Sequence, residues 1–160
     1  MADGGASELV MLITGLLTAG IVASLLISSW GGLANSVDTA QTEVEADAKT
    51  MSALTSDPMQ VDWNQTSCNL TLFVQNTGQI ELNIDSVGAI INGSAATVNH
   101  SRLLGNQTLW NTGEVAELNI CPRGIIMASG QEIFITIIVQ SESFKGVYGQ
   151  HAFTEVIRLV

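Results

Sequence analysis

The sequence predicts an α+β fold, with a long N-terminal α-helix that spans a membrane and continues as a stalk, followed by an all-β, immunoglobulin-like sandwich. Two observations support this fold class. Residues 9–30 carry no charge, and from residue 61 the spacing of apolar residues changes from a helical period to a strand period. We therefore expect two parts: residues 1–58 with the membrane-spanning and stalk helix, and residues 59–160 with the β-sandwich.

The membrane span is predicted by the segment LVMLITGLLTAGIVASLLISSW, residues 9–30. About 20 apolar residues in a helix cross a hydrocarbon core of about 30 Å. Trp30 stands at one end, where an aromatic side chain suits the headgroup level. The alternatives are a buried core helix, which this length and purity disfavour, and a cleaved signal peptide, whose basic N-terminal region is missing.

A helical pattern continues beyond the span. Apolar residues recur in steps of four and three, with Asp47 as the polar exception, at Leu33, Val37, Ala40, Val44, Met51 and Leu54. Ser56-Asp57-Pro58 is a helix stop. We expect one helix from about residue 7 to about residue 55, with a kink at Gly31-Gly32. The seam has two interpretations, a short coiled coil or packing against the chain's own domain.

Small residues on one side of the span have two interpretations, a surface for helix–helix packing or the ordinary Ala and Gly content of membrane helices. Gly15, Ala19 and Ala23 recur every four residues, with Gly20 and Ser24 beside them. Small side chains let membrane helices approach closely. Glu8 belongs to the same predicted surface: its carboxylate either complements the positive start of the helix or pairs with the terminal amine of a neighbouring subunit.

The C-terminal hundred residues predict about seven short strands with regularly spaced turns, the pattern of an immunoglobulin-like sandwich. Asn92-Gly93 is the strongest turn signal, since both residues tolerate a positive φ. The strands are expected at residues 70–75, 81–85, 87–91, 109–110, 114–120, 131–140 and 150–159.

Two signals place this β domain outside the cell and the N-terminus inside. Five N-glycosylation sequons all follow residue 60, at Asn64, Asn69, Asn92, Asn99 and Asn106. Cys68 and Cys121 are the two cysteines of the chain, and an even pair fits a disulfide in an oxidising compartment. The helix is then a signal-anchor of a single-pass membrane protein.

Composition excludes several functional classes. Five Lys and Arg against fifteen Asp and Glu give a net charge of −10, so a nucleic-acid role is disfavoured. His100 and His151 are the two histidines, and neither has the spacing of a metal site. No nucleophile, phosphate or dinucleotide motif is present. We expect no catalytic residue, no metal, no cofactor and no enzymatic activity.

Residues 6–58, from Ser7-Glu8 through the small-residue span and Asn35-Ser36 to Ser56-Asp57-Pro58, resemble the N-terminal region of archaellum (archaeal flagellum) accessory proteins of the FlaG or ArlG family. LTLFVQNTGQIEL, residues 70–82, resembles the first strand and turn of the sandwich in that family and its sister FlaF. The resemblance implies a stator: a membrane-anchored protein whose outer domain binds a FlaF-like partner and the S-layer. The cysteine pair and the sequons depart from the family pattern.

Two alternatives remain open. The first is a type IV pilin-like filament subunit, an archaellin or adhesive pilin, that assembles as a homo-oligomer through its N-terminal helix. Such subunits carry a basic residue and Gly before a peptidase cut, whereas MADGGA has no Lys or Arg, although Gly4-Gly5 could mimic a cut site. The second alternative is a plain membrane-anchored adhesin, which leaves Glu8 and the small-residue face without a role.

Overall fold

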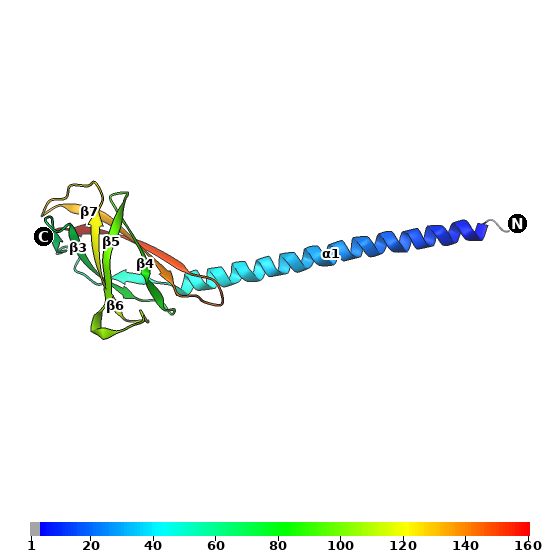
Figure 1. Cartoon of the computed structure of the whole chain (residues 1–160), viewed down its shortest axis with the longest axis horizontal. Helices are drawn as coiled ribbons and strands as arrows, with labels where there is room; N and C mark the ends of the chain where they lie inside the picture. Colours follow the sequence, from blue (N-terminus) through cyan, green and yellow to red (C-terminus); the bar gives the residue numbers. More distant parts are fainter. Residues whose placement is uncertain (1–3) are drawn as a thin grey trace. The chain divides into compact units, whose positions relative to one another are not determined.

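The computed structural model describes residues 4–160, apart from the side chain of Asn106. The described chain begins with a helix of 46 residues and continues as antiparallel strands, so the predicted α+β fold class is confirmed (Figure 1). It divides into two compact units between Gln41 and Thr42, and we call the second of them, residues 42–160, the sheet unit. The elements are α1 (Gly4–Lys49), β1 (Ser52–Leu54), β2 (Trp63–Asn64), β3 (Asn69–Asn76), β4 (Leu82–Ile91), β5 (Ser94–Leu103), a 3₁₀ turn (Leu104–Asn106), β6 (Val115–Pro122), β7 (Glu132–Ser141) and β8 (Gln150–Arg158).

The strands form one continuous hydrogen-bonded path in the order β1-β3-β6-β5-β4-β7-β8, with β2 paired to β3. The path curls back on itself, because Val61 forms a parallel bridge with Leu159 just after β8. The backbone N–H of Val61 donates to the carbonyl of Arg158, and the N–H of Val160 donates to the carbonyl of Val61. The sandwich is therefore a near-closed sheet, not two separate sheets.

Strict alternation of side chains builds the core of the sheet unit. In β3 and β6, buried and half-buried residues alternate along the whole strand, as expected for a sheet with one buried face. The outward residues are half-buried, and the inward ones are aliphatic apart from Asn76 at the end of β3 and Pro122 at the end of β6. The fully buried set includes Leu70, Leu72, Val74, Leu118, Ile120, Ile133, Ile135, Ile137, Val139 and Trp110.

The predicted hairpin turn at Asn92-Gly93 is confirmed between β4 and β5. Asn92 has φ 47° and Gly93 has φ 80°, the left-handed conformations of a tight two-residue turn. The Oδ1 atom of Asn92 also accepts a hydrogen bond from the N–H of Phe134, at 2.9 Å. The turn is thus anchored to β7 as well as joining β4 to β5.

The helix differs from expectation at two places. It runs through Gly31-Gly32 without a break, so the expected kink is wrong. It also ends at Lys49, not near residue 55. The reason lies in the tertiary structure: the N–H of Gln79 donates to the carbonyl of Lys49 at 2.8 Å, and residues 52–54 pair with β3 instead of continuing the helix.

Candidate functional site: an exposed apolar helix

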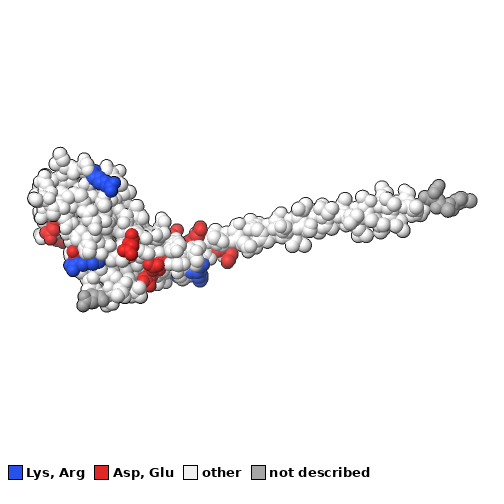
Figure 2. Space-filling model, in the orientation of Figure 1, with Lys and Arg blue, Asp and Glu red and all other residues white. Residues whose placement is uncertain are grey.

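The uncharged segment 9–30 of α1 is exposed along its whole length. Thirteen large apolar side chains of this segment are exposed, including Leu9, Met11, Leu16, Leu25, Ile27 and Trp30. Figure 2 shows this stretch of helix without Lys, Arg, Asp or Glu on the face in view. By length and composition α1 could cross a membrane. At 1.5 Å per residue the segment is about 33 Å long, close to the thickness of a hydrocarbon core.

Three hydroxyl groups inside this segment, those of Thr14, Thr18 and Ser24, need no external partner. Thr14 Oγ1 donates to the carbonyl of Val10 at 2.8 Å, and Thr18 Oγ1 lies 3.0 Å from the carbonyl of Thr14. Ser24 Oγ donates to the carbonyl of Ile21 at 2.9 Å. Each of these three hydroxyls is satisfied by the helix's own backbone, which suits an environment without water.

Helix geometry decides which predicted packing residues share a face. At 100° per residue, Glu8 and Ala19 lie within about 40° of Gly15, and Ala23 within about 80°. Gly20 lies about 140° away from Gly15, so it belongs to a different side of the helix. A Cβ atom added at Gly15 or Gly20 would meet nothing within 4 Å. Packing of this face against another helix stays a prediction.

The last turns of α1 belong to the sheet unit, and two glycines bring the backbone of that unit against them. A Cβ atom at Gly149 would lie 2.4 Å from the carbonyl oxygen of Ala46 and 2.3 Å from Thr50 Oγ1. A Cβ atom at Gly78 would lie 2.4 Å from the carbonyl oxygen of Lys49. Ala46 and Thr50 are fully buried. Only glycine fits at both positions.

Polar contacts reinforce this attachment. Glu45 forms ion pairs with Lys49 and with Lys145 of the β7–β8 loop, and these two lysines lie 4.8 and 5.0 Å from the centre of the Phe144 ring. The hydrogen bonds from Lys145 and then Lys49 lower the pKa of Glu45 from 4.5 to about 2. Asp47 Oδ1 accepts the N–H of Gln150 at 2.7 Å. Asp47, the polar exception in the predicted seam, therefore binds the sheet.

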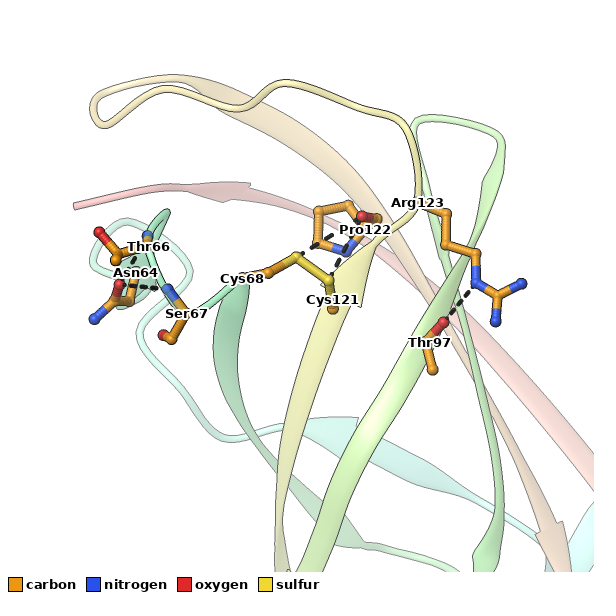
Figure 3. The surroundings of a disulfide bond; sticks show 8 residues. All are labelled: Asn64, Thr66, Ser67, Cys68, Thr97, Cys121, Pro122 and Arg123. Carbon is orange, nitrogen blue, oxygen red and sulfur yellow. Dashed lines mark hydrogen bonds between the residues drawn. A yellow bond between two sulfur atoms is a disulfide. The ribbon is translucent and has the colours of Figure 1, made fainter.

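At another part of the sheet unit the structure joins Cys68 to Cys121, the pair that the sequence predicts (Figure 3). Their Cα atoms lie 5.2 Å apart. Cys68 stands immediately before β3 and Cys121 lies in β6, two strands that pair with each other. The disulfide therefore closes a loop over neighbouring strands that the sheet already holds together.

The predicted sequons lie on the surface to different degrees. Asn64, Asn92 and Asn99 are exposed, Asn69 is half-buried, and the side chain of Asn106 is outside the described residues. Figure 3 shows Asn64 beside the disulfide, in a turn where its Oδ1 accepts the N–H groups of Thr66 and Ser67. Asn64 and Asn69 are cross-strand partners of β2 and β3.

The part of the chain that the structure describes contains no group of three or more His, Cys, Asp or Glu side chains that could hold a metal ion. His151 is engaged structurally, because its Nδ1 accepts the N–H of Ser52 at 3.2 Å. His100 is exposed on β5. The conspicuous functional surface is thus a helix face suited to lipid or to other helices.

A known protein family matches nearly the whole chain. The family model for archaeal-type flagellin matches residues 2–146, which include α1 and the sheet through β7. The chain belongs to the archaeal-type flagellin family. No curated protein matches it significantly.

Archaeal-type flagellins are structural proteins of the motility machinery, so membership of the family makes this chain an archaellum-related structural component. It does not single out the FlaG or ArlG accessory proteins that the sequence resembles. Flagellins are anchored in the membrane or lie outside the cell, and they have an N-terminal apolar helix. The apolar helix is present in this chain as α1.

Sequence analysis missed the roles of Gly78, Gly149 and Lys145, because each acts through a contact distant in sequence.

Proposed function

We propose that this flagellin-family chain is a subunit of a filament, assembled from copies of itself through α1. The observation that carries the proposal is the uncharged, exposed segment 9–30 in a chain whose family match continues from α1 through β7. Apolar surface of this extent must be covered by lipid or by other helices. One segment can serve both needs in turn, first as membrane anchor and then in the core of a filament.

The composition of the segment supports helix packing between copies. The face with Glu8, Gly15 and Ala19 offers small side chains beside a carboxylate. Helices approach closely where side chains are small, and they gain dispersion contacts there. Glu8 is then positioned to pair with a positive group of a neighbouring copy, which would fix the stagger between helices.

The outer β domain is proposed to face the exterior, with the membrane crossed once by α1. The disulfide supports an oxidising compartment, and exposed sequons at Asn64 and Asn99 support an extracellular surface that carries glycans. The alternative is the stator role, in which the outer domain binds a FlaF-like partner and the S-layer. The two roles predict different copy numbers of the chain per cell. They also predict different locations, in purified filaments for a filament subunit and in the membrane for a stator.

Fractionation tests the proposal. Filaments sheared from cells and purified should contain the chain as an integral, stoichiometric subunit, and membranes should hold only the unassembled pool. Mass spectrometry of the filament-borne chain also gives the mature N-terminus, with a cut near Ala6 expected. A chain confined to membranes, at few copies per cell and recovered with S-layer protein, would establish the stator role instead.

A further inference from the structure

The outward side of the β7–β8 hairpin carries an unusual apolar patch. Among the strand residues that the structure describes, Phe134 and Val156 are the exposed large hydrophobic side chains, at 60% and 45% exposure. They lie directly opposite each other, one on β7 and one on β8. Cross-strand partners of this kind form one continuous surface.

The neighbours of this pair continue the surface in both directions. Thr136 and Thr154 face each other and share a hydrogen bond of 2.7 Å between their hydroxyls. The next pair is Ile138 with Ala152, and the pair at the other end is Glu132 with Arg158. We call these eight residues the β7–β8 face: Glu132, Phe134, Thr136, Ile138, Ala152, Thr154, Val156 and Arg158.

The β7–β8 face is electrically neutral in a chain of net charge −10. Its two charges are opposite in sign and sit at one end. Glu155, the other charged residue of β8 between Gln150 and Arg158, pairs with buried Ile135 and so belongs to the opposite side of the hairpin. Two acidic copies of this chain would repel each other least where these faces meet.

The face also complements itself. A two-fold axis that runs parallel to the strands, between β7 and β8, would exchange the two strands of facing copies. Every residue would then lie opposite its own cross-strand partner: Glu132 opposite Arg158, and Phe134 opposite Val156. Phe134 and Ile138 of β7 would meet the smaller Val156 and Ala152 of β8, an arrangement of large against small side chains that suits facing sheets about 10 Å apart.

We propose that the β7–β8 face is a second self-association surface, which pairs two copies of the chain face to face about this axis. A two-fold contact uses the same patch on both copies and closes on itself, so it does not propagate. It is therefore separate from the head-to-tail contacts of a growing filament. It joins copies through the outer domain and does not depend on assembly through α1.

The sequons agree with this assignment. Asn64, Asn69 and Asn99 lie on β2, β3 and β5, and no sequon falls within β7 or β8. Asn92 is the exception, because its Oδ1 accepts the N–H of Phe134 at the edge of the face. Pairing requires that Asn92 carries no glycan, and a glycan found there on every copy would contradict it.

Charge exchange between copies tests the proposal. The full-length chain is purified in detergent with Thr154→Cys as a site for a thiol-specific cross-linker. Glu132→Arg alone and Arg158→Glu alone should each lower the cross-link yield about tenfold, since each places like charges opposite each other at two places. Mixing the two variants should restore the yield between unlike copies, although the pair within each chain stays broken. No recovery in the mixture would overturn the proposal.

Phe134→Ser should lower the same cross-link yield, whereas Ile126→Ser should not, because Ile126 is 89% exposed but lies outside the face. Equal effects of both would also overturn the proposal.

A separate cross-link distinguishes this proposal from helix-mediated assembly. Ala19→Cys reports contact between α1 helices in a parallel sample. Loss of that cross-link alone counts against helix-mediated assembly, and loss of the Thr154→Cys cross-link alone counts against the β7–β8 face.

Discussion

Gly149 approaches Ala46 so closely that its missing side chain is part of the fold. A Cβ atom at position 149 would lie 2.4 Å from the carbonyl oxygen of Ala46. The loop before β8 therefore packs backbone against backbone on the last turns of α1. This contact and the matching approach of Gly78 to Lys49 attach the end of the helix to the sheet.

Gly149→Ala should destabilise the sheet unit by about 1–3 kcal/mol, the usual cost of forcing extra atoms into a packed site. The obstacle is backbone, which cannot rotate away. Urea unfolding followed by tryptophan fluorescence measures the effect. Gly88→Ala is the matched control, because a Cβ atom there would make only an ordinary contact of 3.6 Å with Ile138. Equal stability of the Gly149 and Gly88 variants would show that the contact is dispensable.

Glu45 should make the attachment of the helix end sensitive to acid. Its pKa falls from 4.5 to about 2 through Lys145 and Lys49. A lowered folded-state pKa stabilises the fold above pH 4.5, and this contribution disappears as the pH falls from about 4.5 to about 2. Glu45 is open to solvent, so the effect is small and weakened by salt.

Carboxyl chemical shifts recorded against pH measure the pKa directly. Glu45→Gln should remove this part of the pH dependence, and Lys145→Met should return the pKa of Glu45 towards 4.5. An unchanged pKa in Lys145→Met would mean that the ion pair seen here does not hold in solution.

The Cys68–Cys121 bond should be present in the native protein and should stabilise it. The cysteines are 53 residues apart in sequence. Closing a loop of that length is worth about 4 kcal/mol in the chain-entropy account. Peptide mapping without reductant detects the bond, and Cys68→Ser with Cys121→Ser measures its contribution. Two free thiols in freshly isolated protein would remove the main support for an external domain.

At least two of the five sequons should carry glycans, Asn64 and Asn69 foremost. Asn64 is exposed in its turn, and Asn69 is half-buried at the start of β3. Because the two are cross-strand partners, their glycans would lie side by side on β2 and β3. Glycopeptide analysis gives the occupancy of each site. Five bare asparagines would count against an exterior location.

The sequence predicts what depends on local pattern. The apolar span, the Asn92-Gly93 turn and the alternating β3, β6 and β7 are each visible as periodicity or turn chemistry. β5 (Ser94–Leu103) is not among the predicted strands, because its residues are mostly polar or small and a bulge between Val98 and His100 breaks the alternation. The predicted strand at residues 109–110 is a single bridge between Trp110 and Leu82.

The end of the helix could not be predicted, since Met51 and Leu54 continue the heptad spacing. The competing interactions come from far away in the chain: Gln79 caps Lys49, and β1 pairs with β3. The same holds for Lys145 and Gly149, whose roles depend on contacts about 100 residues distant. The sequence analysis also grouped Gly20 with Gly15. At 100° per residue the two point about 140° apart around the helix axis.

The central claim is that α1 assembles copies of this chain, and Ala19→Leu tests it most directly. The larger side chain should block close approach at the Glu8–Gly15–Ala19 face and still allow insertion into the membrane. Ser24→Leu is the control, since Ser24 lies about 180° from Gly15. The measurement is the amount of chain in sheared, purified filaments relative to membranes. The account predicts membrane-inserted, folded Ala19→Leu protein that is absent from filaments, with Ser24→Leu incorporated normally; normal incorporation of Ala19→Leu would contradict it.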